Sequence, residues 1–283
     1  MTAATPARTA AARPARQVLA RFIDRWSLIV YTMLAVIYLL LPVAVIILFS
    51  FNNPAGKSNT VWQGFTLKYW ADPFGPLGLS DAVIVSLTIA VLSTAIATML
   101  GTLIALALER YQFKGKGLMN SLIFIPMATP EIIMGASLLT MFVAFGGPPL
   151  FPLNFLTILI AHVMFNISYV VVTVRARLAG FPRGLEEAAS DLYANEWHTF
   201  WRVTFPLILP GIIAAALLAF SLSIDDFVIT NFTAGKTQTF PMFIYAKSRI
   251  GIPVQVNVIG TCIFLVAVGG VALTTIAGRR KPR

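Results

Sequence analysis

Residues 182–193, PRGLEEAASDLY, form a polar segment in the middle of a chain that otherwise consists largely of apolar stretches. Its small and apolar residues recur at the spacing of one helix face: Leu185, Ala188, Ala189, Leu192 and Tyr193. Glu186 and Glu187 fall in the first turn, where the helix dipole favours acids. The segment predicts a short helix outside the membrane, which either offers small side chains to a partner's groove or lies on lipid.

The rest of the chain predicts an integral membrane protein. Of its 283 residues 58% are hydrophobic and only 11% are charged, whereas soluble domains carry about 25% charged residues. A helix needs roughly 20 apolar residues to cross a bilayer core. Six stretches meet that length, near 27–50, 81–108, 118–145, 154–174, 209–230 and 257–277. We therefore expect an all-α polytopic membrane protein with six transmembrane helices.

The net charge of +10 does not require a nucleic-acid partner, because membrane topology accounts for it. With the N-terminus in the cytoplasm, the 21 Lys and Arg residues divide into 16 on inside segments and 5 on outside segments. This bias predicts that both termini are cytoplasmic. We expect a disordered basic tail over residues 1–25, a transmembrane domain over 26–278 with a cytoplasmic loop over 175–210, and a basic tail over 279–283.

The third stretch contains a predicted break near residues 126–130. Pro126 and Pro130 each remove a backbone donor and disturb the preceding turn. Thr129 then suits the N-cap of a new helix, with Glu131 in its first turn. The sequence therefore predicts two helical halves with a change of direction between them.

Leaving aside Asp81 at the edge of the second span, three acids lie within the expected spans, Glu131, Asp225 and Asp226, and the spans contain no Lys or Arg. A charge at the membrane centre costs about 2.5–3.5 kcal/mol on insertion scales, so such residues face water or a partner. Three such acids suggest a path for cations. Helix capping explains Glu131 equally well, and simple solvation at an external mouth could explain the aspartates. Neighbours on a helix point about 100° apart, so both aspartates would not face one lumen equally.

No nucleotide or metal site is expected in the chain. Gly56-Lys57-Ser58 and Gly235-Lys236-Thr237 resemble the end of a phosphate-binding loop, but that motif needs a further Gly five residues earlier. Phe51 and Thr230 stand there instead. His162 falls in a span and His198 in an inside loop, so they form no metal cluster, and the single Cys262 allows no intrachain disulfide. We expect no cofactor in this chain and no enzymatic activity of its own.

The polar segment resembles the cytoplasmic EAA loop of bacterial ABC importer permeases. Glu187-Ala188-Ala189 and the later Val203-Thr204-Phe205-Pro206 keep the family's spacing, but Tyr193 stands where the family has Gly. In that family the loop docks on the ATP-hydrolysing subunit. The resemblance implies that the ATPase-coupling residues are Leu185, Glu186, Glu187, Ala188, Ala189, Asp191, Leu192 and Tyr193. Tyrosine resists the left-handed backbone that Gly permits, so the sequence does not decide the conformation of the turn after this helix.

Two further segments, Gly64–Trp70 and Ser221–Thr230, resemble the second permease of spermidine/putrescine importers, within a similarity over roughly residues 60–277. The resemblance implies a permease of the bacterial inner membrane that moves a polyamine from periplasm to cytoplasm by alternating access. Its implied partners are a second permease in a heterodimer, two ATPase subunits that hold ATP and Mg, and a periplasmic solute-binding protein.

In this interpretation Asp225, Asp226 and Glu131 bind the substrate. Cation–π contact from an aromatic residue would assist them, the candidates being Phe220, Phe227, Phe232 and Tyr169. Alternatives are a permease for another small solute, such as an amino-acid derivative or a metal ion, a secondary transporter, or a membrane scaffold. A secondary transporter would show paired broken helices in two halves, and a scaffold would need no acids in its spans.

Overall fold

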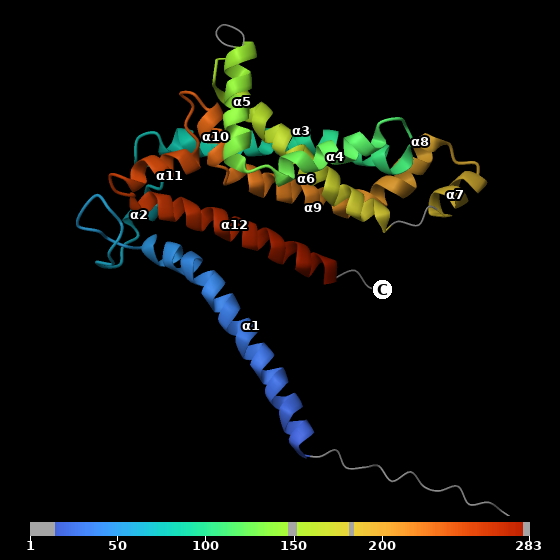
Figure 1. Cartoon of the computed structure of the whole chain (residues 1–283). Coiled ribbons are helices and arrows are strands. Elements are labelled where there is room, and N and C mark those ends of the chain that lie inside the picture. The colour runs from blue at the N-terminus through green and yellow to red at the C-terminus, as the bar shows by residue number, and fades with distance from the viewer. Residues whose placement is uncertain (1–14, 147–151, 181–183, 280–283) are drawn as a thin grey trace, which may run out of the picture. The chain divides into compact units, whose positions relative to one another are not determined.

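The computed structural model describes residues 15–146, 152–180 and 184–279, and every regular element within them is a helix (Figure 1). The expected tail residues 1–14 and 280–283, and Pro182 and Arg183 at the start of the polar segment, lie outside the described residues. The chain divides into two compact units. One contains the residues up to Pro73 together with those from Ile252 onward, and the other contains Phe74–Gly251.

The first unit contains α1 (Ala15–Phe49), α2 (Lys68–Ala71) and α12 (Val254–Arg279). α1 begins at Ala15, so the helix includes residues 15–25 of the segment that we expected to be disordered. α1 packs along α12, where a Cβ added at Gly260 would lie 3.6 Å from Cγ2 of Ile46. The apolar part of α1, Trp26–Phe49, is otherwise unburied and can meet lipid or another chain.

The segment between α1 and α2 is folded around two buried asparagines. Asn52 Nδ2 donates to Asn59 Oδ1 and to the carbonyl of Val61, both at 2.7 Å. Asn59 Nδ2 donates to the carbonyl of Phe49 at 2.8 Å. The Phe51 ring stacks on Phe65 and on Trp70, with centroids 5.5 and 5.2 Å apart. Phe65 and Trp70, which belong to the segment that resembles polyamine permeases, therefore help to order this loop.

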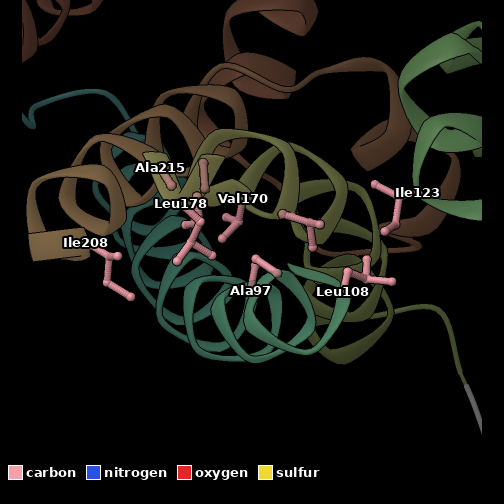
Figure 2. Packing of buried hydrophobic residues seen from close by; sticks show 11 residues of the cluster. Ala97, Leu108, Ile123, Val170, Leu178, Ile208 and Ala215 are labelled. Atoms are coloured by element: carbon pink, nitrogen blue, oxygen red, sulfur yellow. The ribbon is translucent and has the colours of Figure 1, made fainter. Parts of the chain in front are cut away.

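The second unit is built on three long helices, α3 (Leu79–Arg110), α6 (Phe155–Ala179) and α9 (Phe205–Ile224), which pack against one another (Figure 2). Their shared core consists largely of small and β-branched residues, including Ala97, Ala105, Val170, Val171, Val174, Ala215 and Ala219. A Cβ added at Gly101 would come within 2.6 Å of Cγ1 of Val170. Because lipid supplies no hydrophobic force between helices, such close approach is what holds them together.

The predicted break in the third stretch is confirmed. α4 (Lys116–Ala128) and α5 (Glu131–Gly146) meet at a bend of 108°. The Thr129 hydroxyl donates to the carbonyl of Ile125 at 2.6 Å, so it serves the end of α4, whereas we predicted it at the start of α5. Beyond the bend, Met134 and Leu138 of α5 pack against Phe165 of α6 and Ile229 of α10 (Val228–Thr233).

The described helices support a membrane protein. Fewer of them than the six expected are long and apolar enough to cross the membrane. Four segments are long and apolar enough to span a bilayer: Trp26–Phe49, Leu79–Arg110, Phe155–Ala179 and Glu196–Ile224. The bent pair α4–α5 brings the number to five if it forms one span. The predicted end of the fifth stretch at residue 230 is wrong, because α9 stops at Ile224. Short helices complete the second unit: α7 (Gly184–Asp191), α8 (Glu196–Thr199), the π-helix η1 (Phe200–Thr204) and α11 (Phe240–Ser248).

Candidate functional site

The two adjacent aspartates lie in the break between α9 and α10 and point in different directions. α9 ends at Ile224 and α10 begins at Val228, so Asp225 and Asp226 belong to neither helix. Asp225 is exposed, whereas the side chain of Asp226 is only 7% exposed. The carboxylates therefore have different roles.

Asp226 anchors the start of α10. Its Oδ2 accepts hydrogen bonds from the backbone nitrogen of Thr230 at 2.8 Å and from the Thr230 hydroxyl at 2.7 Å. Nε2 of His162 lies 3.4 Å from the same oxygen. Counting only Lys and Arg in the spans missed this neighbour. A buried carboxylate with these contacts is satisfied inside the protein.

His162 connects Asp226 to two long helices, to α9 directly and to α3 through Ser223. Its Nδ1 lies 2.7 Å from the Ser223 hydroxyl of α9, and its Nε2 lies 2.9 Å from the Thr230 hydroxyl of α10. The Ser223 hydroxyl is in turn 3.0 Å from the Ser93 hydroxyl of α3. We call the chain Ser93–Ser223–His162–Thr230–Asp226 the buried polar chain. Sequence reasoning missed it, although a histidine in one predicted span, with acids in other spans, was the available signal.

Asp225 is exposed and makes no hydrogen bond or ion pair with another side chain in the described parts of the protein. Its near neighbour in the chain, Phe227, packs on Tyr245 of α11 with ring centroids 4.7 Å apart. The Arg249 guanidinium lies 5.3 Å from the Tyr245 ring and donates to its hydroxyl. The exposed acid is thus two residues in sequence from an aromatic pair that already contacts a cation.

The other proposed substrate residues are dispersed. Glu131 is exposed at the start of α5, and no hydrogen bond or ion pair between described residues joins it to either aspartate. Phe232 packs against Gly135, and Tyr169 packs on Phe165 at 4.9 Å. Phe220 lines an apolar groove of about 600 Å³ between α3 and α9. Of the four candidate aromatic residues, Phe227 is the one closest in the chain to Asp225.

The predicted coupling segment forms the short helix α7, and its residues divide into two sets. Those that face outward are Leu185, Glu187, Ala188, Asp191, Leu192 and Tyr193, with Ala189 half-buried. Glu186 instead turns inward, where it pairs with Arg110 of α3 and accepts from the hydroxyl of Thr204. Asn195 caps α8, since its side chain accepts from the backbone nitrogen of His198 at 2.8 Å.

Tyr193 adopts the left-handed conformation that we expected it to resist, with φ of +59°. Its backbone nitrogen donates to the carbonyl of Ser190 at 2.9 Å, and that of Ala194 donates to the carbonyl of Ala189 at 3.0 Å. These two bonds are the Schellman pattern that ends helices, in which Gly usually occupies the left-handed position. The tyrosine side chain is 98% exposed, so no packing offsets the backbone cost.

The chain has similarity to known transport proteins. Residues 97–283 match the family of the binding-protein-dependent transport system inner membrane component. The chain is 36% identical over 247 residues to the spermidine/putrescine transport system permease protein PotC of Escherichia coli strain K12, covering 87% of this chain and 91% of that protein. It is also 36% identical over 261 residues to the putrescine transport system permease protein PotI of the same strain, covering 90% and 92%.

Solved structures share the fold. A chain of a bacterial ABC transporter involved in the import of the acidic polysaccharide alginate aligns with a TM-score of 0.69 and 17% identity, covering 94% of this chain and 99% of that one. The MetNI methionine ABC transporter in an inward-facing conformation aligns with a TM-score of 0.55 and 19% identity, covering 71% and 93%. At these identities the likeness concerns the fold alone.

Replacing Tyr193 by Gly is expected to stabilise the turn after α7. A left-handed backbone costs an L-residue about 1–2 kcal/mol, which Gly does not incur. Hydrogen exchange at the nitrogens of residues 193 and 194 should therefore slow by about fivefold. Tyr193→Ala is the matched control, because it keeps Cβ and should exchange like the wild type. Equal exchange in the Gly and Ala variants would show that the backbone is not strained.

Asp226→Asn is expected to lower thermal stability in detergent, because it weakens charge-assisted bonds at a buried position. The loss should be about 1–3 kcal/mol. Asp225→Asn, one residue away and exposed, should stay within about 0.5 kcal/mol of the wild type. If the two variants are destabilised equally, the inward role that we assign to Asp226 is incorrect.

Proposed function

Because the chain belongs to the family of binding-protein-dependent transport system inner membrane components, we propose that it is the transmembrane permease subunit of an ATP-driven importer for putrescine or spermidine. The observation that carries the cargo assignment is the 36% identity to polyamine permeases over nearly the whole of this chain and of theirs. The exposed Asp225 carboxylate agrees with a cationic cargo.

The permease crosses the inner membrane six times, with both termini in the cytoplasm. The four apolar spans and the bent pair α4–α5 supply five crossings, and α12 supplies the sixth. The basic residues concentrate on segments that this topology places inside. α7 then lies on the cytoplasmic side, where an ATPase can reach it.

Asp225 is the cargo-facing acid and Asp226 is its structural neighbour. Asp225 follows the last residue of α9, and the C-terminal end of a helix carries partial negative charge, which favours a cation. Asp226 stands at the opposite end of the next helix, where an acid is favoured for capping. A polyamine ammonium group can bond to the Asp225 carboxylate and contact the Phe227–Tyr245 aromatic pair.

The work of transport comes from partners. Two ATPase subunits hold ATP and Mg and dock on the exposed residues of α7, chiefly Glu187, Ala188 and Leu192. A second permease completes the pathway, and a periplasmic solute-binding protein delivers the cargo. This chain contributes the passage and its coupling to the ATPase, and it carries out no chemical step.

Reporter fusions are expected to give a fixed pattern for this topology. Fusions at residues 114, 190 and 283 should report the cytoplasm, and those at 56, 148 and 240 should report the periplasm. The physical reason is the excess of Lys and Arg on the inside segments. Reversal of any neighbouring pair of fusions would contradict the six-span arrangement.

Asp225→Asn is expected to reduce uptake of labelled putrescine by the complete complex while leaving the amount of protein unchanged. A partly desolvated ionic contact contributes about 1–3 kcal/mol, and we expect a fall of roughly five- to 150-fold. Glu131→Gln should have a smaller effect, because Glu131 can also serve its helix dipole. The measurement is initial uptake in vesicles, with an ATPase that cannot hydrolyse ATP as the blank. Wild-type uptake by Asp225→Asn would contradict the role of Asp225.

A further inference from the structure

Glu186 of α7 makes contacts that docking of a partner does not require. Its carboxylate accepts hydrogen bonds from both terminal nitrogens of Arg110 and from the Thr204 hydroxyl. Arg110 is the last residue of α3, and Thr204 is the last residue of the π-helix that leads into α9. One carboxylate therefore joins a surface helix to two of the long helices.

These contacts fix the orientation of α7. The helix has eight residues, fewer than the roughly 12 that an isolated helix needs. Its apolar side chains contribute little, since Leu185 is 47% exposed and Leu192, just beyond it, is 82% exposed. The elements it touches most are α8 and η1, at one end of the long helices (Figure 1). A two-pronged Arg–carboxylate pair restrains direction as well as distance, so α7 cannot rotate without moving Arg110.

The end of α3 carries a second link beside the first. Oε2 of Glu109, the residue before Arg110, lies 3.8 Å from Nε of Arg175 on α6. Nη1 of Arg175 donates to the side-chain oxygen of Asn120 on α4 at 2.8 Å. The end of α3 is therefore linked to α6, and α6 is linked to α4.

The start of α9 is preceded by an irregular helical turn. η1 has the wide π turn, closed by a bond from the backbone nitrogen of Phe205 to the carbonyl of Phe200. Such turns occur frequently at functional sites, because they depart from the regular helical bonding. Thr204, which donates to Glu186, is the last residue of this turn. Glu186 of α7 thus contacts the π turn that leads directly into α9.

We propose that the contact of Arg110, Glu186 and Thr204 transmits the movement of α7 to α3 and α9, which makes Arg110 a positioning residue for transport. The proposal rests on the proposed function in one respect, namely that α7 receives the ATPase. α7 has a docking face that carries Glu187 and Ala188, and a transmission face that carries Glu186. Association with the ATPase and transfer of its work are therefore separable by mutation.

The test uses charge reversal in the complete complex of both permeases, the ATPase and the binding protein, reconstituted in lipid vesicles. Arg110→Glu and Glu186→Arg should each retain the ATPase subunit but lower the putrescine transported per ATP hydrolysed. We expect a fall of at least about fivefold, the lower end of common coupling between sites. The double variant Arg110→Glu/Glu186→Arg restores opposite charges and should recover most of the ratio. Glu186→Gln, which introduces no reversed charge, should also lower the putrescine transported per ATP hydrolysed.

Matched controls separate this effect from a general effect of charge. Glu196→Arg makes the same change as Glu186→Arg at an exposed position of the same loop and should leave the ratio at its wild-type value. Ala188→Arg lies on the docking face and should lose the ATPase subunit altogether. A wild-type ratio in the single variants would overturn the proposal, as would a double variant no better than the single ones at normal protein level. A wild-type complex that retains no ATPase would instead overturn the proposed function.

Discussion

The buried polar chain from Ser93 to Asp226 is the interaction on which the rest of the second unit depends. It connects α3, α6, α9 and α10 through side chains that are separated by up to 130 residues in sequence. In a membrane interior an unsatisfied polar group is costly, so each member restricts where the next can lie. The buried polar chain therefore holds the break between α9 and α10 in place, and with it the exposed carboxylate of Asp225.

The long helices meet by two different means along their length. Between them lie Ala97, Val170 and Ala215, whose small size lets backbones approach where lipid gives no hydrophobic drive. Polar contacts dominate elsewhere: the buried polar chain around His162, and the links from Glu109 and Arg110 near the end of α3. Long helices that are close-packed in their core and joined by directional bonds move together. This suits a permease, which must change shape as a whole.

Tyr193 shows how a helix end can keep its geometry when its usual residue is replaced. The Schellman bonds to Ala189 and Ser190 are made although Tyr193 carries a Cβ. The backbone pattern at the end of α7 is therefore imposed by the surrounding segment, and the tyrosine ring is left fully exposed beside Leu192. On the proposed docking side of α7, this ring adds an aromatic surface that Gly would not provide.

The sequence by itself determined the class of the protein, the helical character of its apolar stretches, the break near Pro130 and the short helix at 184–191. Each depends on composition or on spacing within a few residues, which local physical chemistry decides. Only the tertiary structure decided what the acids do. Asp225 and Asp226 are chemically alike and adjacent, and Glu186 and Glu187 are as well. Their roles differ because His162, Arg110 and Thr204 reach only one acid of each pair, from positions 18 to 76 residues away. No periodicity along the chain records such contacts, since they arise when distant helices pack.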